Sequence, residues 1–159
     1  MRIAVYPGSF DPITEGHLDV LKRSLKVFDQ VILLLAVNPT KKSLFSIEER
    51  LIMMKEAVED LSGVKVDYTD GLTVDYAKNH HAVALIRGLR AVSDFEYEFQ
   101  LAAANRFASP DVEMVFFMAS KETTFISSST INQLYLNGVD ISPLVPPSVM
   151  KAYQSRKKK

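Results

Sequence analysis

Residues 3–17 of the chain read Ile-Ala-Val-Tyr-Pro-Gly-Ser-Phe-Asp-Pro-Ile-Thr-Glu-Gly-His, and this stretch contains the first unit of the fold. It starts with a short apolar run, Ile3–Tyr6, of the kind that forms a buried parallel strand. Pro7 and Gly8 break the run, and Gly16 and His17 then fall in the first turn of a helix. The stretch therefore predicts a strand, a turn and a helix N-terminus in succession.

Four more apolar runs follow this first one, at Val31–Val37, Val64–Tyr68, Val83–Ile86 and Val112–Met118. Residues with helical spacing lie between them. Ser46 with Glu49, and Ser93 with Glu96, each have the spacing of a helix-starting capping box. The alternation predicts a doubly wound, Rossmann-like α/β fold, with a five-stranded parallel sheet and helices on both faces. No repeat or linker divides the chain, so residues 1–159 are expected to form a single domain.

The composition excludes several classes of protein. The 159 residues are 47% hydrophobic and 24% charged, as in an ordinary globular protein. Lys and Arg total 19, as do Asp and Glu, and this balance argues against nucleic-acid binding. Cysteine is absent, which excludes disulfides and thiolate catalysis. We see no signal peptide and no apolar run long enough to span a bilayer, so we expect a cytoplasmic protein with a solvated basic tail at residues 156–159.

Basic residues follow most of the predicted strands. In an open α/β sheet, ligands bind beyond the carboxyl ends of the strands. The turns at that edge contain five cations, namely Lys41, Lys42, Arg87, Arg90 and Lys121. A neutral protein that gathers cations on one edge of its sheet is expected to receive phosphates there.

His17 is the most specific candidate within this edge. A helix N-terminus attracts anions and disfavours a protonated imidazole, so a histidine there is better explained by contact with a phosphate. The chain has neither a Walker A loop nor a Gly-x-Gly-x-x-Gly turn. Ser127–Ser129 could be either a helix cap or a second phosphate cradle, and the residues alone leave both open. Phe95, Phe99 and Phe107 make one helix apolar on more than one face, which predicts a buried helix, as in a subunit interface.

Three segments together resemble a known family of enzymes. They are the Pro7–Asp11 turn with Thr14-x-Gly16-His17, the stretch Arg87–Glu98, and Phe125–Ser129. They are similar to nucleotidyltransferases of the Thr/His-x-Gly-His superfamily and, within it, to the bacterial phosphopantetheine adenylyltransferase family, over essentially the whole chain. The resemblance implies transfer of the adenylyl group of ATP to 4′-phosphopantetheine in coenzyme A biosynthesis. The products would be dephospho-coenzyme A and pyrophosphate, with Mg²⁺ required.

The resemblance also implies roles for individual residues. His17, Lys41 and Ser9 would be catalytic, and Ser9, Lys41, Thr73 and Arg87 would bind the acceptor. ATP would contact Ser9, Phe10, His17, Gly88, Leu89, Arg90, Glu98, Thr123, Thr124, Phe125, Ile126, Ser127, Ser128 and Ser129. Three positions depart from the family pattern: Ser9 replaces a threonine, Thr123-Thr124 replaces an aromatic-serine pair, and Asn132 replaces a basic residue. These departures affect the expected affinities rather than the reaction.

The expected chemistry agrees with this set of side chains. A phosphate monoester has a second pKa of about 6 and is largely dianionic at pH 7, so it can attack in line without a protein general base. Mg²⁺ would be held mainly by substrate phosphates. Family likeness further suggests a homohexamer and feedback inhibition by coenzyme A. Two alternatives stay open: a related transferase acting on nicotinate mononucleotide or glycerol 3-phosphate, and a regulatory module that binds ATP without turnover.

Overall fold

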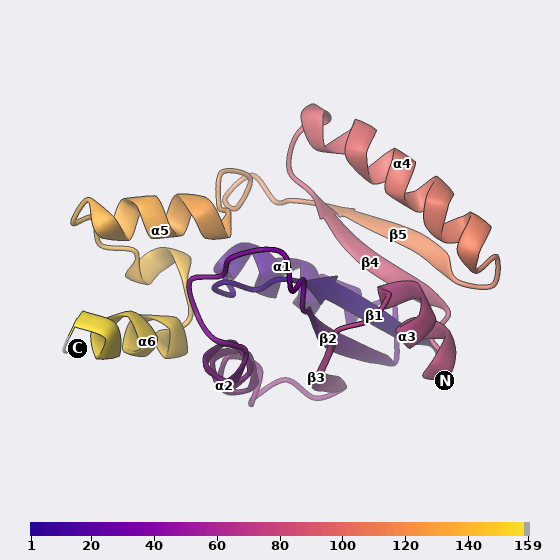
Figure 1. The fold of residues 1–159 in the computed structure, drawn as a ribbon, viewed down its shortest axis with the longest axis horizontal. Helices are drawn as coiled ribbons and strands as arrows, with labels where there is room; N and C mark the ends of the chain where they lie inside the picture. The colour runs from indigo at the N-terminus through magenta and orange to yellow at the C-terminus, as the bar shows by residue number, and fades with distance from the viewer. Residues whose placement is uncertain (158–159) are drawn as a thin grey trace.

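The computed structural model describes residues 1–157, and its centre is a five-stranded sheet of parallel strands in the order β3-β2-β1-β4-β5 (Figure 1). The strands are β1 (Ile3–Gly8), β2 (Gln30–Ala36), β3 (Val64–Thr69), β4 (Ala84–Leu89) and β5 (Glu113–Met118). The predicted doubly wound α/β fold is confirmed. Of the basic tail, Lys158 and Lys159 lie outside the described residues.

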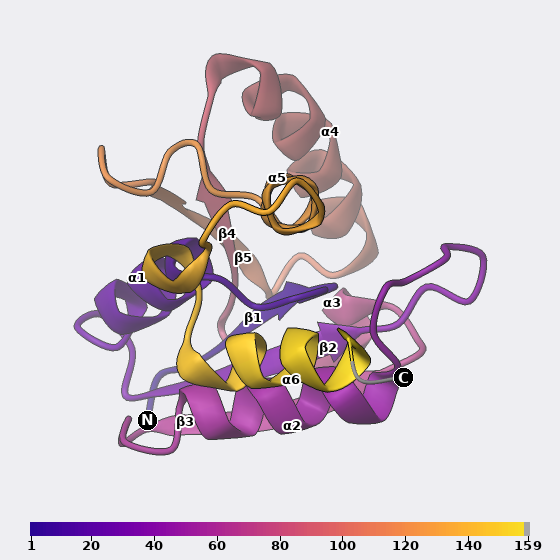
Figure 2. The ribbon, with the colours of Figure 1, turned by 90° about the vertical axis from the view of Figure 1, so that its left-hand side faces the viewer.

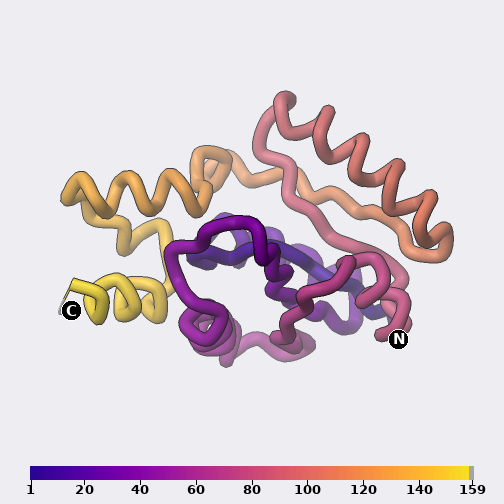
Figure 3. The backbone as a smooth tube through the Cα atoms, viewed as in Figure 1, coloured from indigo at the N-terminus to yellow at the C-terminus, as the bar shows by residue number. Residues whose placement is uncertain are grey.

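Helices cover both faces of this sheet. They are α1 (Glu15–Ser24), α2 (Ile47–Ala57), α3 (Thr73–Asn79), α4 (Val92–Ala108), α5 (Ser128–Leu136) and α6 (Pro147–Lys157), with a 3₁₀ turn, η1, at Ser142–Leu144. Helices α2 and α6 lie side by side on one face (Figure 2). The trace ends in α5 and α6, at the end of the molecule opposite the N-terminus (Figure 3). None of the helices within residues 1–157 is long and apolar enough to cross a membrane.

The core has two layers because alternate strand residues point to opposite faces. The larger layer joins Tyr6 and Leu33 of the sheet to α1, α2, α5 and α6. The smaller layer joins Val5 and Leu34 to Val74 and Ala77 of α3. Burial on both faces explains why the central strands β1 and β2 read as apolar runs, whereas the edge strand β3 alternates with the polar residues Lys65 and Asp67.

The strand order reverses between β1 and β4. Strand β1 pairs with β2 on one side and with β4 on the other, so chain connections leave it in opposite directions. A doubly wound sheet binds its ligands at such a switch point. The sheet therefore places Gly8, which ends β1, and Arg87, near the end of β4, at the expected binding edge.

Strand β4 extends further than the sequence predicts. We expected Arg87, Gly88 and Leu89 in a turn, but they belong to the strand and pair with Phe116, Phe117 and Met118 of β5. This pairing with β5 keeps the backbone extended beyond Ile86. Arg87 is therefore held by the sheet itself and not by a loop.

The two predicted capping boxes differ in outcome. Ser46 caps α2 as expected, with its hydroxyl accepting the Glu49 N–H while the Glu49 carboxylate accepts the Ser46 N–H. The capping box at Ser93 is wrong, because Ser93 already lies inside α4. Instead, the Asp94 carboxylate accepts the N–H groups of Arg90 and Ala91. A carboxylate in the first turn is also favoured by the helix dipole.

Helix α4 is not buried within the chain, contrary to the expectation from its apolar composition. Phe95, Phe99 and Phe107 are 54%, 64% and 92% exposed. The buried residue of α4 is instead Glu98, whose carboxylate bonds Arg87. The apolar pattern indicates a surface suited to burial, but no residue among 1–157 covers Phe95, Phe99 and Phe107.

Candidate active site

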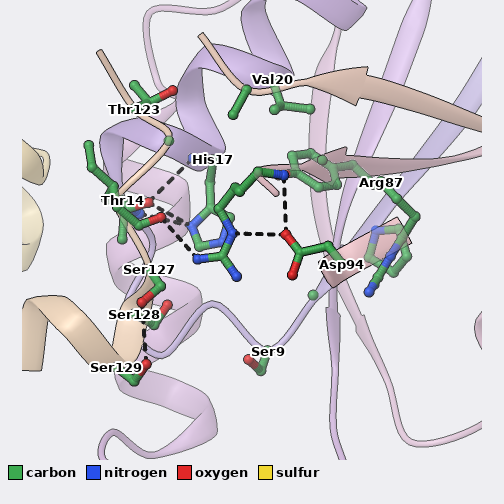
Figure 4. Close-up of a pocket in the computed structure, with 18 of the residues that line it drawn as sticks. Ser9, Thr14, His17, Val20, Arg87, Asp94, Thr123, Ser127, Ser128 and Ser129 are labelled. Carbon is green, nitrogen blue, oxygen red and sulfur yellow. Dashed lines mark hydrogen bonds and ion pairs between the residues drawn. The ribbon is translucent and has the colours of Figure 1, made fainter. Parts of the chain in front are cut away.

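A cavity of about 480 Å³ opens at the switch point, between the ends of β1 and β4 and the N-termini of α1 and α5 (Figure 4). Its walls hold most of the polar side chains expected from the sequence. These are Ser9, His17, Lys41, Arg87, Arg90, Glu98, Thr123 and the serines Ser127, Ser128 and Ser129, with Gly88 and Ile126 between them. Segments far apart in the sequence thus converge on one hollow.

The ring of His17 is fixed by the start of its own helix. Thr14 caps α1, and its hydroxyl oxygen accepts the backbone N–H of His17 at 3.3 Å. In return, the backbone N–H of Thr14 donates to Nδ1 of His17 at 3.0 Å. A nitrogen that accepts an N–H carries no proton of its own, so the ring proton of the neutral imidazole sits on Nε2. His17 is therefore set up as an Nε2–H donor.

The surroundings of His17 also keep it neutral. Burial and, as a smaller contribution, the positive charge of Arg90 together lower the pKa of His17 to about 4. The ring of Phe10 packs edge-on against the imidazole, with centroids 4.9 Å apart. At pH 7 His17 is an uncharged hydrogen-bond donor on the cavity wall.

Two arginines in the cavity are each oriented by a carboxylate. Arg87 Nε and Nη2 donate to the two oxygens of Glu98, at 2.9 and 2.7 Å. Burial opposes the charge on Arg87, but its hydrogen bonds to the Glu98 carboxylate and the negative charge of that group more than offset this and raise the pKa of Arg87 above its usual value. Arg90 pairs loosely with Asp94 at 3.9 Å and donates to the carbonyl of Ile126 at 3.3 Å. Because Glu98 occupies only one edge of the guanidinium, the Nη1 group of Arg87 is left for a ligand.

Two helix N-termini, those of α1 and α5, border the cavity. At α5 the serines divide their roles. Ser127 caps the helix by accepting the Thr130 N–H, and the Ser128 hydroxyl donates to the carbonyl of Pro12 at 2.8 Å. The helix-cap interpretation of Ser127 is thus confirmed. Ser128 ties α5 to the turn before α1, which sets the distance between two positive helix ends.

Five residues that the resemblance assigns to substrates do not line this cavity: Phe10, Thr73, Leu89, Thr124 and Phe125. Phe10 is only 1% exposed and lies beneath His17, where it supports the ring. Thr73 is the first residue of α3. Lys121, which we expected at the same edge, also lies outside the cavity lining.

Other cavity residues were given no role of their own from the sequence. Thr14 and Asp94 line the cavity and act through His17 and Arg90. Spacing alone could have indicated both, since Thr14 lies three residues before His17 and Asp94 four after Arg90. Tyr6 and Val20 also line the cavity, as part of the strand and helix that frame it, and no local signal marks them.

The cavity does not contain a ligand set for a divalent cation. Within residues 1–157, no three His, Asp or Glu side chains come together as metal ligands. The cavity carboxylates of Asp94 and Glu98 are already bonded to Arg90 and Arg87. These residues do not fit a resident Mg²⁺ site built from protein ligands.

The fold and this cationic cavity at a switch point define a nucleotide-binding transferase. Residues 5–134 match the cytidylyltransferase-like family. A solved structure of a proposed nicotinate-nucleotide adenylyltransferase from Vibrio parahaemolyticus superposes with a TM-score of 0.72, over 96% of this chain and 98% of that one. Its sequence identity is 20%, so this likeness concerns the fold alone.

Curated relatives show to which family of nucleotide-binding transferases the chain belongs. A phosphopantetheine adenylyltransferase from Caldanaerobacter subterraneus subsp. tengcongensis is 47% identical, over 100% of this chain and 99% of its own length. Another, from Clostridium novyi, is 51% identical over 95% of this chain and 94% of its own length. The chain belongs to the phosphopantetheine adenylyltransferase family, as the resemblance predicted.

Proposed function

We propose that the protein transfers the adenylyl group of ATP to 4′-phosphopantetheine, a step of coenzyme A biosynthesis. A phosphate oxygen of the acceptor forms a bond to the α-phosphorus of ATP. The bond from that phosphorus to the bridging oxygen breaks, and the products are dephospho-coenzyme A and pyrophosphate. The observation that best supports the proposal is the convergence of Ser9, His17, Lys41 and Arg87 on one cavity.

No protein base is needed in this reaction. The acceptor phosphate is largely dianionic at pH 7, since its second pKa is about 6. His17 is also poorly suited to be a base, because Nδ1 accepts the Thr14 N–H and Nε2 carries the ring proton. Catalysis would then depend on alignment and on stabilising charge, as is usual in phosphoryl-type transfers.

His17 is the proposed stabilising group at the reacting phosphorus. Negative charge grows on the α-phosphate oxygens as the acceptor attacks, and an Nε2–H bond to one of them strengthens in the transition state. The ring needs no reorganisation to make this bond, because Thr14 and Phe10 already hold it. Lys41 and Ser9 would bind the acceptor phosphate and the α-phosphate on the same side of the cavity.

Arg87 is the proposed anchor of the acceptor. Its guanidinium can bind a phosphate through Nη1 while Nε and Nη2 remain on Glu98. Glu98, which the resemblance places beside ATP, lines the cavity and would act there mainly by orienting Arg87. Arg90 and the α5 N-terminus would receive the phosphates of ATP on the other side. Mg²⁺ would arrive as part of the ATP complex, held by the substrate's phosphates.

The exposed apolar face of α4 supports self-association, and we propose the homohexamer that the resemblance suggests. Phe95 and Phe99 lie with their ring centroids 5.8 Å apart in a tilted arrangement, and Phe107 is exposed farther along the same helix. Exposed apolar surface gathered on one element marks interaction sites. Light scattering of the purified protein measures the mass directly. Coenzyme A shares the structure of the product, dephospho-coenzyme A, so it would inhibit by occupying the same cavity.

The test of the proposed function is pyrophosphate release from ATP and Mg²⁺ with each of three acceptors: 4′-phosphopantetheine, nicotinate mononucleotide and glycerol 3-phosphate. We expect release with 4′-phosphopantetheine alone, and inhibition on addition of coenzyme A. Release with another acceptor would reassign the substrate. ATP binding without release in any mixture would favour a regulatory module.

A further inference from the structure

Asp11 joins the turn after β1 to the segment that carries Lys41. Its Oδ2 accepts the backbone N–H of Leu44 at 2.7 Å, and its Oδ1 accepts that of Phe45 at 2.9 Å. Both carboxylate oxygens are thus used on the backbone of one loop. Because Asp11 lies two residues after Ser9, and Leu44 three after Lys41, this contact links the two phosphate-binding segments.

Arg50 makes a second link between the same segments from α2. Its Nη1 donates to the backbone carbonyl of Ser9 at 3.0 Å, and its Nη2 reaches Ser43 Oγ at 3.5 Å. Its Nε donates to the carbonyl of Ser46 at 3.4 Å. One guanidinium therefore bridges the Ser9 turn, the Lys41 loop and the start of α2.

The burial of Arg50 makes this link unusual. The residue is only 5% exposed, and within residues 1–157 no carboxylate lies within 4.0 Å of its guanidinium. A buried cation without a counter-charge is expensive, and an apolar residue of similar size would often be as stable. Helix α2 is already held by its Ser46 capping box and by its contacts with α6. The contacts of Arg50 are therefore better explained by what they position.

The two links join the segments that carry Ser9 and Lys41. Both residues line the cavity, and Ser9, Lys41, Asp11 and Arg50 also line a second hollow directly beside it. Asp11 and Arg50 do not line the first cavity, and their hydrogen bonds go to the segments that carry Ser9 and Lys41. We propose that Asp11 and Arg50 are positioning residues that set Ser9 and Lys41 in register for adenylyl transfer. This rests on the proposed function, and misplacement by about 1 Å can cost about 100-fold in rate.

The test is a double-mutant cycle between Asp11→Asn and Lys41→Ala, measured as pyrophosphate release with 4′-phosphopantetheine. Asparagine keeps one acceptor oxygen but turns an amide toward the second N–H. If Asp11 acts through Lys41, the two changes are not additive. We expect each single variant to lower kcat about 10- to 100-fold, and the double variant to lie within about threefold of the weaker single one. Losses that multiply would overturn the proposal.

Three further variants separate positioning from folding. Ser148→Ala removes a buried hydrogen bond, 2.9 Å long, from Ser148 Oγ to the carbonyl of Met53 near the middle of α2. It should lower Tm and leave kcat within about twofold of the wild type, whereas Asp11→Asn should lower kcat at an equal or smaller loss of Tm. Arg50→Lys keeps the charge and should retain more kcat than Arg50→Met at matched Tm. Equal activity in these two, or unchanged kcat in Asp11→Asn, would contradict the proposal.

A failure of the proposed function can be told apart from a failure of this inference. If the wild type releases no pyrophosphate with any acceptor, the proposed reaction is wrong. The four proteins of the double-mutant cycle are therefore also titrated with ATP and Mg²⁺ by calorimetry. Non-additive changes in Kd would then still support the link between Asp11 and Lys41, and additive or absent changes would refute it.

Discussion

The backbone N–H of Thr14 donates to Nδ1 of His17 at 3.0 Å, so the helix start itself selects the protonation state of the ring. A capping box is ordinarily a stabilising device. Here the side chain that reaches back to the cap is the imidazole of His17 instead of a glutamate. Its other nitrogen, Nε2, carries the proton that we propose is donated to the substrate. One local contact thus joins helix formation to the proposed catalytic role.

Replacing Thr14 by valine separates these two functions of the capping box. The hydroxyl that accepts the His17 N–H is lost, but the backbone donor to Nδ1 remains. We expect stability to fall by about 1 kcal/mol, while kcat stays within about threefold of the wild type. Urea unfolding and initial rates measure the two effects, with Thr14→Ser as the control. A large loss of kcat would show that the hydroxyl, and not the backbone, fixes the ring.

The low pKa of His17 makes the stability of the protein depend on pH. An unfolded histidine binds a proton below about pH 6.5, whereas the folded His17 does so only near pH 4. The unfolded state therefore binds more protons in this window, and stability falls as the pH falls from 6.5 to 4. We expect the wild type to lose up to about 3 kcal/mol more than His17→Asn over that range. The measurement is the free energy of unfolding at each pH. If it changes with pH in the same way in both proteins, the buried neutral state of His17 is contradicted.

A methyl group on Gly8 should disturb His17 through Phe10. A Cβ at Gly8 would lie 3.1 Å from Cε2 and Cζ of Phe10, which is too close for the buried ring to stay in place. We expect Gly8→Ala to lower kcat about tenfold or more with little change in ATP affinity. Adding Phe10→Leu, which shortens the side chain, should restore part of kcat. No recovery in the double variant would assign the loss to direct contact of Gly8 with the substrate.

The pairing of Arg87 with Glu98 predicts which of the two substrates has its KM raised when the Glu98 carboxylate is replaced. In Glu98→Gln, Arg87 keeps at most one of its two bonds, so its orientation toward the acceptor loosens. We expect the acceptor KM to rise about tenfold and the ATP KM less than about threefold. Asp94→Asn is the matched control, because it loosens Arg90 and should raise mainly the ATP KM. The opposite pattern would place Glu98 in direct contact with ATP.

Much of the fold could be predicted because buried parallel strands have a strong signature. All five apolar runs became strands, and the turns after them gave His17, Lys41 and the cap at Ser127. These features depend on residues close together in the chain, where periodicity and capping preferences are informative.

The features that could not be predicted depend on distant partners. Strand β4 runs on through Arg87–Leu89 only because β5 lies beside it. The bonds from Arg87 to Glu98, and from Arg50 to the Ser9 carbonyl, join separate elements across 11 and 41 residues. Helix α4 was expected to be buried because its sequence is apolar on more than one face. Composition does not say whether this chain or another copy covers that surface.

The most direct measurement of the central claim is pyrophosphate release by His17→Ala with 4′-phosphopantetheine, together with its Kd for ATP. If His17 donates a bond that strengthens in the transition state, kcat should fall about 100- to 1,000-fold while the ATP Kd changes less than about threefold. Equal losses in kcat and in ATP affinity would show that His17 only binds the nucleotide. An unchanged kcat would remove it from the reaction altogether.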